Sequence, residues 1–157
     1  MRLLNTTEAQ NRMFLHHEIC EAVRYLARDK HTATLGIIGV GFKPGSSSAK
    51  GSCFRDVIRD ILHPSSENTI FSVSIWDDLE TTQELIRGLQ PSGFTNDRVS
   101  RASSATDIVE KSDVIIVGNM HAHTFRQYGF LELLKGHKNV IDPRKILDGT
   151  TFPIDRS

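Results

Sequence analysis

The chain has 157 residues, with 19 acidic and 19 basic side chains and a formal net charge of zero, a length that suits one domain with a single sizeable core. Balanced charge and few aromatic residues exclude the basic surface that sequence-independent nucleic-acid binding needs, so no nucleic-acid partner is expected. No apolar run reaches the roughly 20 residues of a membrane span and no signal segment opens the chain, which predicts a cytoplasmic protein without a membrane partner.

The first expected element is an amphipathic helix within residues 1–31, which would connect to a main domain of residues 32–157. Residues 7–10 read TEAQ, which fits a capping box at the start of a helix. Apolar residues then recur at three- and four-residue steps, as on one buried helix face: Leu15, Ile19, Ala22, Val23 and Leu26. The charged residues between them are expected to face water: Arg12, Glu18, Glu21, Arg24 and Arg28.

After this helix, apolar strands alternate with amphipathic helices. Strands are expected over residues 35–40, 70–75, 99–102, 113–119 and 139–142. Helices are expected from Ser52 to about residue 63, over residues 81–89, from Ser104 and over residues 130–134, and a polar loop should hold His121 and His123. This alternation predicts an α/β fold: a doubly wound, Rossmann-like parallel sheet of about five strands with an N-terminal helix. Right-handed crossovers give the strand order 3-2-1-4-5.

The glycine- and serine-rich loop after the first strand is the leading candidate for a binding site. Residues 35–53 read LGIIGVGFKPGSSSAKGSC, an apolar strand and then a loop with Lys43 and Lys50 before a helix. Ligands of open α/β sheets collect where strands end, and a helix N-terminus with two lysines suits an anion such as phosphate. We expect this loop and residues 118–125 to border one crevice. A serine-rich surface turn without a ligand is the alternative.

Neither standard phosphate motif fits this loop. Pro44 stands where the third glycine of a dinucleotide fingerprint would fall, and Asp77 is too far downstream for the usual ribose-binding acid. Lysine and glycine at residues 50–51 are in the wrong order for a Walker-type loop.

Histidine and cysteine patterns do not predict a metal site or a catalytic residue. Near His121 and His123 no third ligand stands at a suitable spacing. His16 and His17 are neighbours on a helix and therefore point in different directions. The two cysteines, Cys20 and Cys53, are too few for a disulfide framework or a zinc site, and no base is evident beside Cys53 at its helix start.

Arg144 follows the last apolar strand, at the edge of the sheet where ligands collect. Its guanidinium can bind a phosphate or a carbonyl-bearing base through two donors. An ion pair with Asp142 or Asp148 is the alternative for this residue.

Four stretches of the sequence occur in an order that resembles a known family. Residues 39–52 read GVGFKPGSSSAKGS, which is similar to the signature G-x-x-FKPGTDDxRxSP. The others are the first helix with Asn5, Gln10 and Arg12, the strand SDVIIVGN at residues 112–119, and the segment VIDPRKILDG at residues 140–149. Together they resemble the C-terminal, nucleotide-sugar-binding domain of the UDP-glucose/GDP-mannose dehydrogenase family. The strand ending VIIVGN is closer to the GDP-mannose type.

The resemblance implies a role within a larger enzyme. In this family an NAD-binding Rossmann domain and a central dimerising helix precede such a domain, and the enzyme oxidises an alcohol carbon twice, to a carboxylate, through a cysteine thiohemiacetal. The resemblance implies that Phe42 and Lys43 lie against the nucleotide sugar, GDP-mannose or UDP-glucose, and that Arg144 holds the nucleotide. It implies that Lys50 reaches the phosphates of NAD, which is bound mainly by another domain of a homodimeric enzyme.

The sequence also departs from the family pattern. Ser47 and Ser48 stand where the family has an acidic pair, Lys50 replaces an arginine, and Cys53 replaces a proline. Neither Cys20 nor Cys53 matches the catalytic-cysteine segment, so this polypeptide alone is not expected to run the oxidation. Two alternatives follow: a non-catalytic nucleotide-binding or regulatory module of the same fold, and a free-standing NAD-binding Rossmann domain.

Overall fold

The computed structural model describes residues 8–41, 52–63, 69–89 and 98–143. Its elements in chain order are α1 (Glu8–Leu26), β1 (Thr32–Ile38), α2 (Cys53–Leu62), β2 (Ile70–Trp76), α3 (Leu79–Leu89), β3 (Val99–Arg101), α4 (Ala105–Lys111), β4 (Val114–Val117), α5 (Ala122–Gln127), α6 (Phe130–Leu134) and β5 (Val140–Ile141). The five strands form one parallel sheet in the order β3-β2-β1-β4-β5. The predicted α/β fold and its strand order are therefore confirmed.

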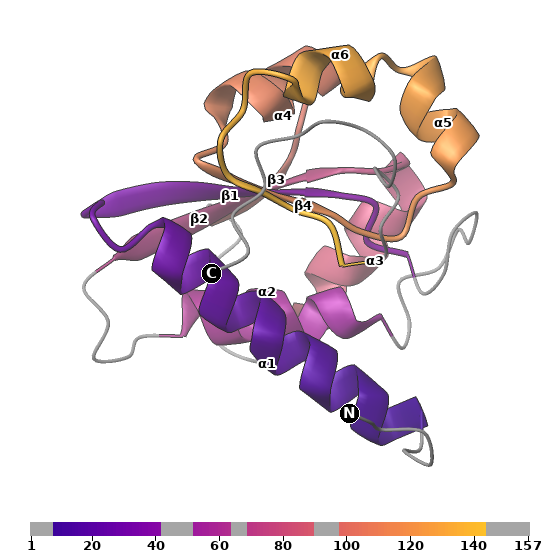
Figure 1. The fold of residues 1–157 in the computed structure, drawn as a ribbon. Helices are drawn as coiled ribbons and strands as arrows, with labels where there is room; N and C mark the ends of the chain where they lie inside the picture. The colour runs from indigo at the N-terminus through magenta and orange to yellow at the C-terminus, as the bar shows by residue number, and fades with distance from the viewer. Residues whose placement is uncertain (1–7, 42–51, 64–68, 90–97, 144–157) are drawn as a thin grey trace.

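Helices cover both faces of this sheet, with α1, α2 and α3 on one side and α4, α5 and α6 on the other (Figure 1). Successive side chains of a strand point to opposite faces, so β1 and β4 supply residues to both cores. On β4, Val114 and Ile116 join the core beneath α2, whereas Ile115 and Val117 join the core beneath α4 and α6. This double burial explains why β4 is apolar at every position.

Two helices, α2 and α4, start at serine caps that the sequence indicates. Ser52 Oγ accepts a hydrogen bond of 3.1 Å from the backbone N–H of Phe54 and so caps α2. Ser104 Oγ accepts one of 3.0 Å from Asp107 and caps α4. These bonds satisfy N–H groups that the first turn of a helix leaves without an intrahelical partner.

The N-terminal helix α1 packs against α2 and belongs to the main core. Ile19, Cys20 and Val23 are buried together with residues of β1 and α2. The prediction that Arg24 faces water is wrong, because this side chain is only 25% exposed and its guanidinium lies 2.9 Å from Asp60 Oδ1 on α2. Thr7 lies outside the described residues.

The loop predicted around His121 and His123 is mostly helical, which corrects that expectation. His121 is the N-cap of α5, and His123 lies within this six-residue helix. Its sequence, AHTFRQ, contains one large apolar residue, Phe125, which is buried at 1% exposure. A helix this short has no repeating apolar stripe for a periodicity argument to detect.

None of the described helices combines the length and apolar character needed to cross a membrane.

Backbone hydrogen bonds join the residues at the ends of β1 and β4, where two glycines leave no room for a side chain. The backbone N–H of Gly118 donates to Ile38 over 2.8 Å, and that of Asn119 donates to Gly39 over 2.9 Å. A Cβ atom on Gly118 would collide with the carbonyl oxygen of Gly39, and one on Gly39, where φ is +88°, would lie 2.5 Å from the carbonyl oxygen of Asn119. Both positions therefore require glycine.

We expect Gly118→Ala to lower the free energy of unfolding by about 1–3 kcal/mol, because its methyl group has no room beside Gly39. Urea unfolding followed by circular dichroism measures this change. The matched control is Gly136→Ala, where nothing lies within 4 Å of the added Cβ and the change should stay within about 0.5 kcal/mol. Equal effects of the two substitutions would contradict the close contact.

Candidate functional site

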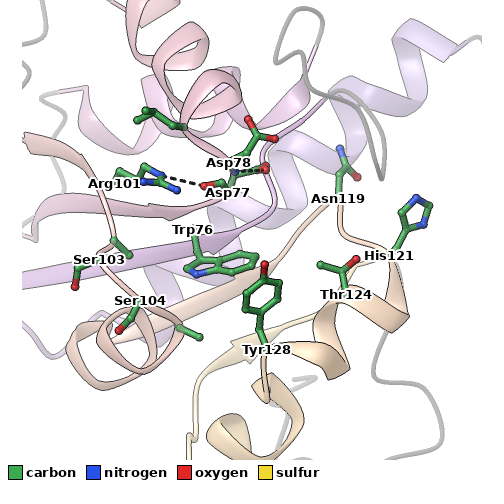
Figure 2. A pocket seen from close by; sticks show the side chains of 13 residues that line it. Trp76, Asp77, Asp78, Arg101, Ser103, Ser104, Asn119, His121, Thr124 and Tyr128 are labelled. Atoms are coloured by element: carbon green, nitrogen blue, oxygen red, sulfur yellow. Dashed lines mark hydrogen bonds between the residues drawn. The ribbon is translucent and has the colours of Figure 1, made fainter.

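A cleft of about 650 Å³ opens at the carboxyl edge of the sheet (Figure 2). Its walls come from the last residues of β2 and β3 and from the segments after β2, β3 and β4: residues 76–79, residues 101–105, and Asn119, His121, Thr124 and Tyr128. Small-molecule sites have about 300–1,000 Å³, and ligands of open α/β sheets bind beyond the carboxyl ends of the strands. This cleft is therefore the candidate functional site.

Aromatic side chains form one part of the cleft. Trp76, the last residue of β2 and the only tryptophan of the chain, is half-buried. The ring of Tyr128 meets it edge to face, with 4.7 Å between centroids, and Phe130 meets it in the same manner at 5.0 Å. These contacts fix the indole, while Tyr128 remains 50% exposed. The pair offers apolar ring surface to a planar ligand group.

Two aspartates follow Trp76, and both hold backbone in place. Asp77 accepts hydrogen bonds from the N–H groups of Val40, over 2.8 Å, and Asp78, over 2.7 Å. Asp78 accepts from the backbone N–H of Thr81, over 2.7 Å, and from its hydroxyl, over 3.0 Å. Burial raises the pKa of Asp77, against the opposing effect of the hydrogen bonds from Val40 and Asp78. Asp78 thus anchors the first turn of α3, and Asp77 anchors the segment after β1.

Residues 101–105, at the end of β3 and after it, add a cation and hydroxyl groups to the lining of the cleft. Arg101 is exposed at the end of β3, and its Nε donates to the carbonyl oxygen of Asp77 over 3.0 Å. Ser103 and Ser104 follow it and are also exposed. The cleft therefore combines aromatic rings, carboxylates, hydroxyls and a guanidinium, a set that suits a polar ligand with a planar ring.

Side chains from two sides of the cleft hold the entrance to the glycine- and serine-rich loop. Asn119, which is 8% exposed, donates its side-chain amide to the carbonyl oxygen of Gly41 over 2.6 Å. Asp77 accepts from the N–H of the preceding residue, Val40. Val40 and Gly41 are therefore held by residues that line the cleft.

The four residues that the sequence analysis assigned to binding, Phe42, Lys43, Lys50 and Arg144, lie outside the described residues. The expected crevice is supported on one side, because Asn119, His121 and Thr124 line the cleft. The rest of its described lining comes from residues 76–79, residues 101–105 and Tyr128, which sequence reasoning missed. The predicted strand order could have identified the two segments, since it places the ends of β2 and β3 at the same edge.

Other residues considered from the sequence lie as follows. The rings of His121 and His123 stack with 5.4 Å between their centroids. His16 and His17 point to different partners, Asp60 and Glu21. Cys53 is buried in the core at the start of α2.

A scan of the sequence against models of known protein families finds no match, and a search of curated proteins finds no significant match.

Because the pKa of Asp77 is raised, the free energy of unfolding should depend on pH. Its folded pKa lies above the ordinary value of 3.8, so its stabilising effect is complete below the unfolded pKa and is lost as the pH rises through the folded pKa. We expect the free energy of unfolding of the wild type to fall relative to that of Asp77→Asn between about pH 3 and pH 7. Denaturant unfolding across this range measures the difference.

The asparagine keeps one acceptor oxygen and does not titrate, so its lost hydrogen bond contributes an offset that is constant with pH. The opposite result would be a wild type whose free energy of unfolding rises with pH relative to that of Asp77→Asn. It would show that the hydrogen bonds from Val40 and Asp78 affect the pKa of Asp77 more than burial does.

Proposed function

We propose that this chain is a sugar-nucleotide-binding domain that receives the nucleotide in the cleft at the carboxyl edge of its sheet. The observation that carries the proposal is that Asn119 and Asp77, which line the cleft, also hold Val40 and Gly41, the two residues directly before the FKPG segment. In this proposal the cleft and the segment that resembles a nucleotide-sugar signature form one site.

In this proposal the base packs against the exposed face of Tyr128 beside Trp76. The Arg101 guanidinium then donates to a carbonyl oxygen of the base or to a ribose hydroxyl. The diphosphate extends toward the segment after Gly41, where the sequence supplies Lys43 and Lys50.

The resemblance supplies the larger context of the proposal. The domain would act in the cytoplasm as the C-terminal part of an NAD-dependent dehydrogenase of the UDP-glucose/GDP-mannose type, in which other domains bind most of the NAD and supply the catalytic cysteine. Phe42 and Arg144 would contact the nucleotide sugar, and Lys50 the phosphates of NAD. The full enzyme would be a homodimer.

One observation favours a second candidate, an NAD-binding domain. The structure brings Asp77 to the end of β2, directly beside the segment after β1, although its spacing in sequence is longer than usual. An acid at this place holds the ribose in Rossmann dinucleotide sites. Each oxygen of Asp77 already accepts a backbone N–H, which favours the first candidate.

We expect the chain to bind GDP, UDP, GDP-mannose or UDP-glucose with quenching of its single tryptophan, Trp76, and with measurable heat in calorimetry. Tyr128→Ala should weaken binding by about 1–3 kcal/mol, the usual loss on removing an aromatic ring stacked on a base. Tyr25→Ala is the control, because Tyr25 is a similarly exposed tyrosine (44%) on α1 and does not line the cleft.

The same titration separates the candidates. Lys43→Ala and Arg144→Ala should weaken nucleotide binding while the unfolding midpoint stays close to that of the wild type. Absence of heat with all four nucleotides would contradict the proposed site. A stronger response to NADH than to any of them would favour the dinucleotide-binding alternative.

A further inference from the structure

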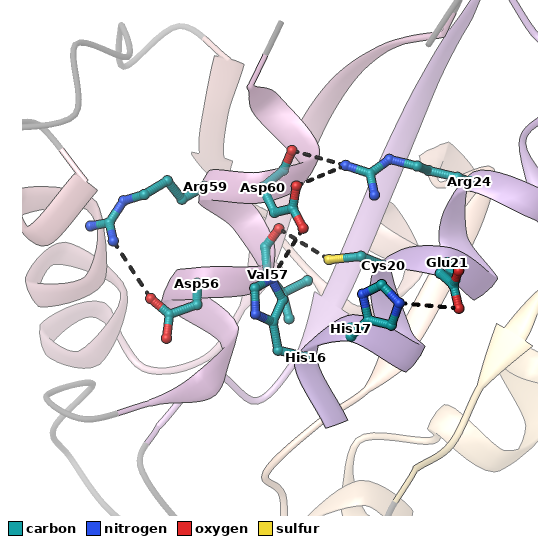
Figure 3. Close-up of polar contacts among 9 residues, drawn as sticks. All are labelled: His16, His17, Cys20, Glu21, Arg24, Asp56, Val57, Arg59 and Asp60. Carbon is teal, nitrogen blue, oxygen red and sulfur yellow. Dashed lines mark hydrogen bonds and ion pairs between the residues drawn. The ribbon is translucent and has the colours of Figure 1, made fainter. Parts of the chain in front are cut away.

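A cluster of three side chains with metal-binding atoms lies between α1 and α2, away from the cleft (Figure 3). His16 and Cys20 are one helical turn apart on α1 and therefore share a face. Asp60 reaches them from α2, with its Oδ2 atom 3.2 Å from His16 Nε2. One ligand atom from each residue lies within 4.8 Å of the other two.

These three atoms are an imidazole nitrogen, a sulfur and a carboxylate oxygen. Zn²⁺ binds all three types at about 2.0–2.3 Å, which places neighbouring ligands of a tetrahedral ion about 3.3–3.8 Å apart. The separations in the cluster exceed this range by about 1 Å at most, so the ligand atoms must move closer by that amount to bind one ion. A thiolate and an imidazole together favour Zn²⁺ over Mg²⁺ or Ca²⁺.

Arg24 orients the carboxylate of this cluster. Its guanidinium binds Asp60 Oδ1 over 2.9 Å and the backbone carbonyl oxygen of Asp60 over 3.1 Å. Oδ2 is thereby directed toward His16, as outer hydrogen bonds direct the ligands of metal sites. The positive charge of Arg24 opposes a bound cation, whereas the negative charges of Asp60 and of a Cys20 thiolate attract it.

The same groups have another arrangement when no ion is present. The Cys20 thiol donates to the carbonyl oxygen of Val57 over 3.8 Å, and burial raises its pKa to about 12. An incoming ion must therefore replace the thiol proton, which leaves to water, and separate His16 from Asp60. These costs predict weaker binding than in a site with preformed thiolates.

We propose that His16, Cys20 and Asp60 bind a Zn²⁺ ion that links α1 to α2, with water as the fourth ligand. The side chains of His16 and Asp60 are partly exposed, at 28% and 39%, which leaves a route for the ion and the water. The proposal is independent of nucleotide binding. It departs from the sequence-based expectation of no metal site, because Asp60 stands 44 residues from His16 and only the fold brings them together.

Co²⁺ is the probe for this site, because a thiolate ligand gives it a charge-transfer band in the near ultraviolet. We expect one Co²⁺ to bind per chain with this band, and Zn²⁺ to displace it. Cys20→Ser should abolish the band, and His16→Gln should weaken binding by at least about tenfold. The matched controls are Cys53→Ser, the other cysteine of the chain, and His17→Gln, whose ring points to Glu21.

Thermal unfolding gives a second readout that does not depend on the colour of the complex. Zn²⁺ should raise the unfolding temperature of the wild type and of His17→Gln, since an ion that binds only the folded state stabilises it, and should raise that of His16→Gln less at the same concentration. A band that persists in Cys20→Ser, or the absence of a band in the wild type, would overturn the proposal. Equal weakening by the His16 and His17 substitutions would also overturn it.

Discussion

The hydrogen-bonded contact between the ends of β1 and β4 is the constraint on which the candidate site depends. Because neither Gly39 nor Gly118 carries a side chain, the two backbones approach closely enough for the Asn119 N–H to reach Gly39. Asn119 can then bind Gly41 from one side while Asp77 binds Val40 from the other. Polar side chains at the cleft are thus held on a rigid sheet rather than on the loop itself, which is how binding sites gain a defined geometry.

Local patterns in the sequence were sufficient to predict the fold. The unbroken apolar character of β4 indicates burial on two faces, and Ser52 and Ser104 mark helix starts that the structure confirms. Contacts between distant residues could not be predicted in this way. Arg24 has the sequence context of an exposed residue, and only the packing of α1 on α2 brings Asp60 to its guanidinium. The walls of the cleft at residues 76–79 and 101–105 likewise come together only when the strands pair.

The cleft and the cluster of His16, Cys20 and Asp60 lie in different parts of the fold. The cleft depends on segments that follow the strands, where loops can vary without disturbing the core. The cluster depends on the helix layer, where Ile19 and Val23 bury α1 and the hydrogen bonds of Asp60 connect it to α2. In the proposed enzyme α1 would connect this domain to the preceding one. An ion between α1 and α2 would then stabilise the connection without contacting the nucleotide.

The most direct test of the central claim is to map nucleotide binding on the full chain by two-dimensional NMR. If the cleft binds a nucleotide sugar, GDP-mannose or UDP-glucose will shift the indole N–H of Trp76 and the amides of Arg101, Ser103 and Asn119. The amides of Thr34 and Ser72, which line a second hollow at the amino edge of the sheet, will stay unchanged. Shifts confined to that amino edge, or no shifts at saturating nucleotide, would contradict the account.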